Sequence, residues 1–193
     1  MNIATLFRWG LPTVALCLFA GGCASASGPV NTGWEQRGAD GLYYHKGTDR
    51  LYDGTFQLTG EGEQFRGQVV GGRREGAFVA TSVGGLKKSE LHYRNNVLNG
   101  AAQSWFENRK LRTDLEFANG KFVRGVTYKP DGQEATRADK GTGQLTAYFD
   151  NGKIHWEKTW ESGVQVRDVV YNPDGSVKTD RWGEKPKPPA PAP

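Results

Sequence analysis

Few side chains in this sequence have the types and spacing that catalysis or metal binding requires. The three histidines, His45, His92 and His155, are 47 and 63 residues apart, and none has a carboxylate or cysteine at metal-ligand spacing. The stretch Gly60-Glu-Gly62-Glu-Gln has the glycines of a phosphate loop but carboxylates where such a loop needs N–H groups and lysine. No Gly-x-Ser-x-Gly nucleophile elbow occurs. We therefore expect no catalytic residue, no metal site and no cofactor, and we predict that the protein is not an enzyme.

Cys23 is the residue with the clearest chemistry, which is lipid attachment. Residues 1–22 have the form of an export signal: Arg8 lies near the amino terminus, and an apolar stretch too short to span a membrane follows. The small residues Ala20-Gly21-Gly22 then precede Cys23, and this pattern resembles a bacterial lipobox. The resemblance implies cleavage before Cys23, attachment of diacylglycerol to its sulfur, and acylation of the new amino terminus by a fatty acid such as palmitate. The alternative is an ordinary signal peptide with an incidental cysteine.

A lipid on Cys23 would place the protein at a membrane. One acyl chain gives only marginal binding, whereas several hold stably. The next residue is Ala24 and not aspartate. By resemblance to the sorting pattern of enterobacterial lipoproteins, this implies the outer membrane of a Gram-negative cell, with the folded domain in the periplasm.

The composition favours strands and turns over long helices. Glycine accounts for 27 of 193 residues, and aromatic residues make up 11% of the chain. The two cysteines exclude a disulfide scaffold and a zinc site of cysteines, since Cys17 lies in the predicted signal. The net charge of +4 is too small to indicate nucleic-acid binding.

These sequence features predict four segments. Residues 1–22 are the signal, and residues 23–40 are the lipidated cysteine and a flexible tether of small and polar residues. Residues 41–182 form a repeat domain. Residues 183–193 are a proline-rich disordered tail, which is either a solubilising terminus, a spacer or a ligand for a partner.

The repeat domain is marked by regularly placed glycines. Its best internal match has an offset of 43 residues, pairing residues 100–120 with residues 143–163 without a gap. Phe106 then meets Phe149, and Phe117 meets Trp160. The glycine markers are Gly54, Gly76, Gly100, Gly125 and Gly143.

Within each repeat the apolar residues alternate with polar ones. Leu111, Leu115 and Phe117 share one predicted face of a strand, while the polar face of the matching strand carries His155 and Glu157. Turn dipeptides separate the strands, so each unit is predicted to be a β-hairpin. These dipeptides are Asn99-Gly100, Asn119-Gly120, Asp131-Gly132, Asn151-Gly152 and Asp174-Gly175.

The repeat unit resembles that of a known family. It reads Gly-x-x-x-x-(Tyr/Phe)-x-x-x-Gly-Lys, then a strand ending in an aromatic residue, then an Asn-Gly turn. This resembles the MORN-repeat variant of bacterial YwqK-family antitoxins over roughly residues 51–178. The resemblance implies an all-β fold, an elongated antiparallel meander of hairpins. The sequence departs from the family pattern at two places. Phe106-Glu-Asn-Arg-Lys lacks the glycine that precedes lysine in the repeat unit, and residues 136–141 do not follow the pattern.

The predicted function is a non-catalytic protein-binding or scaffolding module, anchored in the cell envelope through Cys23. One sheet layer cannot cover its own apolar face, so the sheet must curl, pair with a second copy or meet a partner. If exposed, the candidate contact residues are Tyr93, Phe117, Trp156 and Trp160. Self-association through a face or an edge is possible too.

Three other functions fit the same pattern. The first is an immunity or antitoxin-like protein that neutralises a toxin. The second is a phospholipid binder that uses Arg73-Arg74, Lys87-Lys88 and Lys121. The third is a peptidoglycan or glycan binder that stacks tryptophan on sugar rings.

Overall fold

The computed structural model describes residues 33–37, 41–60 and 62–182, and this part of the chain is all β without a helix, as predicted. It contains fourteen antiparallel strands, most of them joined as hairpins in sequence order. The strands are β1 (Trp34–Gln36), β2 (Tyr43–His45), β3 (Gly54–Gly60), β4 (Glu63–Val70), β5 (Arg73–Ser82), β6 (Lys87–Arg94), β7 (Val97–Trp105), β8 (Leu111–Ala118), β9 (Lys121–Tyr128), β10 (Glu134–Ala138), β11 (Gly143–Tyr148), β12 (Ile154–Glu161), β13 (Val164–Tyr171) and β14 (Val177–Trp182).

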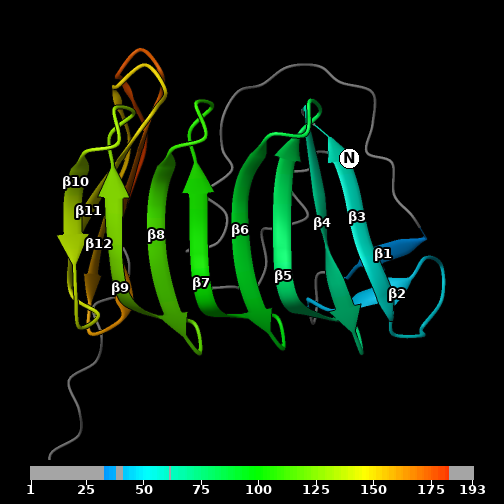
Figure 1. Cartoon of the computed structure of the whole chain (residues 1–193). Coiled ribbons are helices and arrows are strands. Elements are labelled where there is room, and N and C mark those ends of the chain that lie inside the picture. The colour runs from blue at the N-terminus through cyan, green and yellow to red at the C-terminus, as the bar shows by residue number, and fades with distance from the viewer. Residues whose placement is uncertain (1–32, 38–40, 61, 183–193) are drawn as a thin grey trace, which may run out of the picture.

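The strands form three sheets. The large sheet runs β10-β9-β8-β7-β6-β5-β4-β3, and β11-β12-β13-β14 form a second sheet that folds back behind the β9–β10 end of the first (Figure 1). The short pair β1-β2 lies behind the opposite end, near β3 (Figure 1). The array therefore curls at both ends, which is one of the predicted ways to cover an apolar face.

Tight turns of two residues lie at one end of the sheets. Both central residues of each turn have positive φ, as the type I′ hairpin turn requires. Asn119-Gly120 was predicted as such a turn and is confirmed. The predicted turn at Asn99-Gly100 is wrong, because both residues lie inside β7. The other tight turns are Gly71-Gly72, Asn95-Asn96, Lys140-Gly141 and Ser162-Gly163.

Wider turns of five residues lie at the opposite end. In each, the first N–H donates to the fifth carbonyl and the fourth N–H donates to the first carbonyl. Three of them contain the predicted dipeptides at residues 131–132, 151–152 and 174–175. The wide turns are Ser82–Leu86, Phe106–Lys110, Lys129–Gln133, Phe149–Lys153 and Asn172–Ser176.

The 43-residue offset reappears as a repeated set of contacts between wide turns. Lys110 Nζ donates to the Asp131 carbonyl at 2.6 Å, and Lys153 Nζ donates to the Asp174 carbonyl at 2.9 Å. Each of these hydrogen bonds joins one wide turn to the next. The structural repeat therefore consists of two hairpins. Asparagine amides make the companion bonds, from Asn108 to the Pro130 carbonyl and from Asn151 to the Pro173 carbonyl.

A threonine cluster holds the corner where the second sheet leaves the first. Thr127 Oγ1 donates to the Thr146 carbonyl at 2.7 Å, and the Thr146 N–H donates to Thr136 Oγ1 at 2.9 Å. β11 thereby packs on β9, and Gly125 provides the space, because a Cβ there would lie 3.0 Å from Leu145 Cδ1. The polar stretch that departs from the family pattern forms β10 and this corner.

The folded part begins earlier than predicted. Trp34, which the sequence places in the tether, is buried in β1 and stacks on Phe56 with ring centroids 4.6 Å apart. Tyr43 of β2 meets the same Phe56 ring edge-on at 5.7 Å. The tether assignment is therefore wrong for residues 34–36, because aromatic burial draws them into the fold. Cys23, the signal and the proline-rich tail lie outside the described residues.

Candidate functional site

The four aromatic residues predicted as possible partner contacts lie in the core. Tyr93, Phe117, Trp156 and Trp160 are between 0% and 5% exposed, so the condition under which they would contact a partner, exposure at the surface, is not met. The physical cause is the folded-back second sheet. Trp160 of β12 stacks on Phe122 of β9 at 4.4 Å.

Tyr93 is held by different neighbours at the centre of the large sheet. Its ring meets Phe78 edge-on at 5.4 Å, and the Arg74 guanidinium lies 4.0 Å from its centroid. Burial raises the pKa of the Tyr93 hydroxyl, which the charge of Arg74 partly offsets. These contacts are those of a core residue.

The basic residues considered for lipid binding do not form one surface. Arg74 is buried against Tyr93, and Arg73 and Lys121 flank tight turns. Lys87 and Lys88 lie at the wide-turn end of the sheet, where they pair with acidic neighbours. Their partners are Glu90 for Lys87 and Glu107, at 3.3 Å, for Lys88.

His155 is buried, although the alternation predicted it on the polar face. A β-bulge between Ala147 and Tyr148 breaks the period of two where β11 pairs with the start of β12. The His155 ring then packs on Phe149, with centroids 4.2 Å apart. One repeat earlier, the Arg112 guanidinium lies over the Phe106 ring at 4.7 Å.

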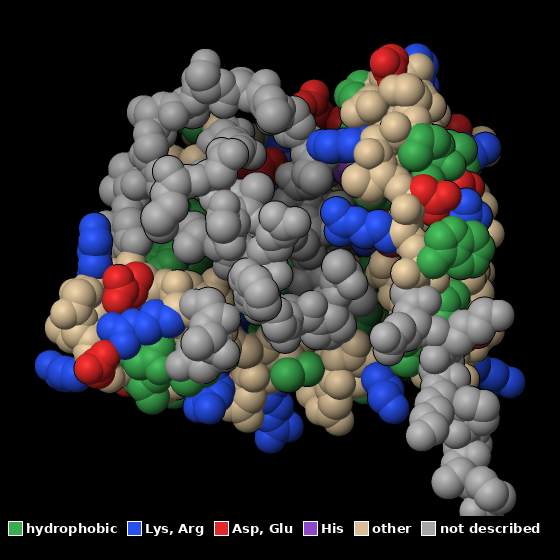
Figure 2. Space-filling view, turned by 180° about the vertical axis from the view of Figure 1, so that it is seen from behind, with side chains coloured by type: hydrophobic (Ala, Val, Ile, Leu, Met, Phe, Trp, Pro, Cys, Tyr) green, Lys and Arg blue, Asp and Glu red, His purple; other side chains and the backbone are tan. Residues whose placement is uncertain are grey.

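The exposed surface with the strongest potential for partner contact is the last described strand, β14, which we call the terminal strand. Val177 is 58% exposed and Trp182 is 72% exposed, and nearly every residue of the strand is exposed. Among the described strands β14 pairs only with β13, so its other edge is open. The side of the molecule that holds β11–β14 has hydrophobic side chains among charged ones on its surface (Figure 2).

Trp182 contacts a charged pair formed by side chains of β13 and β14. The Arg167 guanidinium lies 4.7 Å from the Trp182 ring centroid and makes two hydrogen bonds to the Asp180 carboxylate, at 3.1 and 3.3 Å. The bond to Asp180 raises the pKa of Arg167, which burial opposes. Tryptophan and arginine are the residue types that most often dominate binding energy at protein interfaces.

The 43-residue repeat relates β14 to β10. β14 lies 43 residues after β10, so Thr179 takes the place of Thr136. β11 packs beside β10 through its bond to Thr136, while no described strand does so for β14. β14 therefore occupies the same repeat position as β10, but among the described strands it lacks the neighbour that β10 has in β11.

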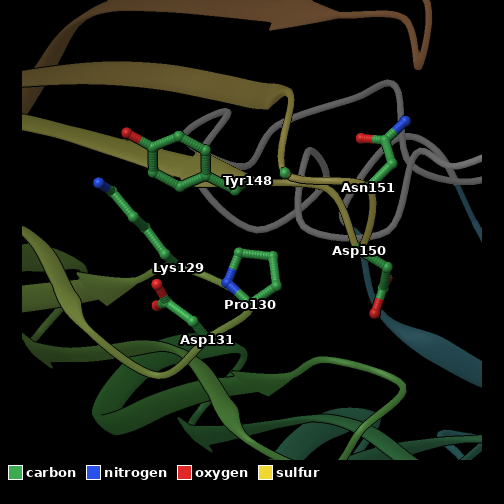
Figure 3. Close-up of a pocket in the computed structure, with 7 residues that line it drawn as sticks. Lys129, Pro130, Asp131, Tyr148, Asp150 and Asn151 are labelled. Atoms are coloured by element: carbon green, nitrogen blue, oxygen red, sulfur yellow. The ribbon is translucent and has the colours of Figure 1, made fainter.

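A second surface feature is an open, shallow hollow of about 500 Å³ between two wide turns (Figure 3). Both of its carboxylates already hold the turns. Asp131 accepts the Gln133 N–H at 2.8 Å, and Asp150 accepts both the Arg112 guanidinium at 2.8 Å and the Glu107 N–H at 2.7 Å. We therefore assign the hollow a structural role. Its lining is Lys129, Pro130, Asp131, Tyr148, Asp150, Asn151 and Gly152.

Two negative observations concern the described part of the chain alone. Within residues 33–37, 41–60 and 62–182, no group of three or more histidine, cysteine or acidic residues could hold a metal ion. Within the same ranges, no helix is long and apolar enough to cross a membrane.

Comparison with known proteins identifies no family. No family model matches the chain, and no curated protein matches it. Among solved structures, the chain is similar to one in the crystal structure of a GtfA/B complex bound to UDP and GlcNAc. The two are 10% identical, and the alignment covers 77% of this chain and 28% of that chain with a TM-score of 0.25. A likeness this low carries no argument, so the MORN-variant resemblance stays a prediction.

Proposed function

We propose that this protein is a membrane-anchored, non-catalytic module that binds a protein partner in the cell envelope. The anchor is the predicted lipid on Cys23, and the array of hairpins is a rigid scaffold related to the MORN-repeat variant. The terminal strand β14 is the element that contacts the partner.

One observation carries this proposal: β14 is exposed on both faces, and one of its edges is paired with no other strand of the described residues. An open edge offers backbone N–H and C=O groups to an extended segment of another protein. Trp182 and Arg167 supply side chains for specific contact beside that edge. The aromatic residues of the core are not available for this purpose, so the end of the array is where a partner fits.

The test is an affinity capture from membranes with the full anchored chain, followed by a titration of the recovered partner. Trp182→Ala should weaken binding at least tenfold, since truncation of an interface anchor costs about 2 kcal/mol or more. Val83→Ala is the matched control, because Val83 is 67% exposed in the wide turn at Ser82–Leu86. Equal affinity of the two variants would contradict the assignment of β14.

The anchor is tested separately. Mass spectrometry of the native protein should find Cys23 acylated at the amino terminus, and Cys23→Ser should move the protein from the membrane to the soluble fraction. An unmodified Cys23 in the membrane-bound protein would remove the anchor from the proposal.

The identity of the partner distinguishes the other predicted functions. A toxic protein recovered by the capture would support the antitoxin-like function. Binding of the unlipidated Cys23→Ser chain to anionic vesicles or to peptidoglycan, unchanged by Trp182→Ala, would favour a surface binder instead.

A further inference from the structure

The opposite end of the array has a second open edge, which differs in chemistry from the terminal strand. Among the described strands, β3 (Gly54–Gly60) pairs only with β4, so it closes the large sheet at the end opposite β10 (Figure 1). β3 contains no charged residue and no proline. By contrast, β14 carries three charged residues, Lys178, Asp180 and Arg181.

The sequence of β3 is nearly a palindrome. It reads Gly-Thr-Phe-Gln-Leu-Thr-Gly, with Gln57 at its centre. Two copies of such a strand that pair antiparallel about a two-fold axis at Gln57 set identical or similar residues opposite each other. Thr55 faces Thr59 of the second copy, and Phe56 faces its Leu58.

The backbone of β3 directs the right groups outward for this pairing. Alternate residues of an edge strand point their N–H and C=O groups away from the one partner strand. The Thr55 carbonyl accepts the Tyr52 hydroxyl at 2.8 Å, so Thr55 belongs to the outward set. Gln57 and Thr59 share that set because the period is two. Pairing therefore requires the Tyr52 hydroxyl to leave the Thr55 carbonyl, which then accepts the Thr59 N–H of the second copy.

Burial on the two faces of β3 agrees with the same arrangement. Phe56 and Leu58 are buried on the inner face, in the aromatic cluster that also contains Trp34 and Tyr43. Pairing of two copies would join their two clusters across the new strand pair. Threonine pairs and aromatic–aliphatic pairs across neighbouring strands are both favourable.

We propose that β3 is a homodimer interface, with β3 strands of two copies paired antiparallel about a two-fold axis through Gln57. Closed two-fold dimers are the commonest form of protein self-association. The pairing continues the large sheet from one copy into the other. It leaves β14 free at the far end of each copy and does not depend on the function proposed for β14.

Cysteine cross-linking in the full chain tests the register. Residues of a hydrogen-bonded antiparallel pair have Cα atoms about 5.5 Å apart, within the range that a disulfide spans. Gln57→Cys should therefore yield a disulfide-linked dimer on a non-reducing gel. Asp180→Cys, on the other open edge, is the matched control, and wild type shows the background from the native cysteines. Cross-linking of Gln57→Cys no faster than of Asp180→Cys would overturn the proposal.

Charge substitutions test the interface without cross-linking. Gln57→Lys sets two like charges opposite each other and should raise the dimer dissociation constant at least tenfold in sedimentation equilibrium. At protein concentrations below the wild-type dimer dissociation constant, its thermal unfolding should match that of wild type, because Gln57 is only half-buried on the outer face. A mixture of Gln57→Lys and Gln57→Glu should restore the dimer. A monomeric wild type, or a dimer that Gln57→Lys leaves intact, would contradict the assignment of β3.

Discussion

Lys158 and Asp168 face each other across β12 and β13 with Nζ and Oδ1 3.6 Å apart, and both side chains are buried. One repeat earlier, the same two positions hold Leu115 and Gly125, which are paired across β8 and β9. The second repeat therefore replaces an apolar pair with an ion pair. Lys158 lies on the inner face of β12, since its Nζ is 5.3 Å from the Trp156 ring centroid.

Replacing this ion pair with the residues of the first repeat should be nearly neutral. Lys158→Leu alone leaves the Asp168 charge buried and should lower the free energy of unfolding by about 3–5 kcal/mol. The double variant Lys158→Leu/Asp168→Gly should recover most of that loss, because the apolar pair needs no charge compensation. Urea unfolding measures both. A double variant as unstable as the single one would show that the ion pair itself is required.

The contacts between wide turns should contribute equally in the two repeats. Lys110→Met and Lys153→Met each remove one hydrogen bond to a carbonyl of the next turn. Each should lower the free energy of unfolding by about 0.5–1.5 kcal/mol. Lys129→Met, at an exposed position of a neighbouring wide turn, is the control and should change little. Unequal effects of the first two substitutions would contradict a common repeat.

Gly125 should tolerate no side chain. An alanine Cβ would lie 2.5 Å from Leu115 Cδ2, so Gly125→Ala should destabilise the protein by about 1–3 kcal/mol. Gly84→Ala is the matched control, because its Cβ would be 3.7 Å from Ser82 Oγ. The double variant Gly125→Ala/Leu115→Ala measures the coupling. If Gly125→Ala and Gly84→Ala unfold at the same urea concentration, Leu115 and Leu145 do not approach Gly125 as closely as described.

Alkaline pH should destabilise the fold through two buried tyrosines. Burial raises the pKa of both Tyr43 and Tyr93, and the charge of Arg74 partly offsets this. As pH rises, the unfolded chain loses these protons first, near its ordinary tyrosine pKa of about 10. The stability that the neutral hydroxyls contribute is therefore complete below about pH 10 and is lost as pH rises through the folded pKa values.

This loss is measured by urea unfolding between pH 8 and pH 11. Wild type should lose up to about 1.4 kcal/mol per pH unit for each tyrosine above pH 10. Tyr43→Phe/Tyr93→Phe should show a shallower decline. Parallel pH profiles of the two proteins would indicate that neither hydroxyl is buried.

The sequence predicts the fold well where one physical rule dominates. The alternation from Leu111 to Phe117 predicts β8, and the Asn119-Gly120 turn is confirmed. The turn at Asn95-Asn96 was missed because asparagine there adopts positive φ without a glycine, with φ of 51° and 68°. Tertiary packing, which local pattern does not report, decides the fold-back at β10.

The candidate site was less predictable. Trp156 and Trp160 have the clearest alternation pattern, but both are buried. The same alternation is typical of a core face and of a binding face, so the pattern could not distinguish the two. Trp182 stands after the last repeat, where no internal match marks it. Its exposure follows from the position of β14, whose outer edge is paired with no described strand, and the local sequence carries no signal of this.

The central claim is that the terminal strand contacts a protein partner, and site-specific photocross-linking in living cells tests it most directly. A photoreactive amino acid in place of Trp182 should form one defined cross-linked protein product with the full chain. The same amino acid in place of Val83 should form none. Absence of a product at position 182, or the same product from both positions, would contradict the claim.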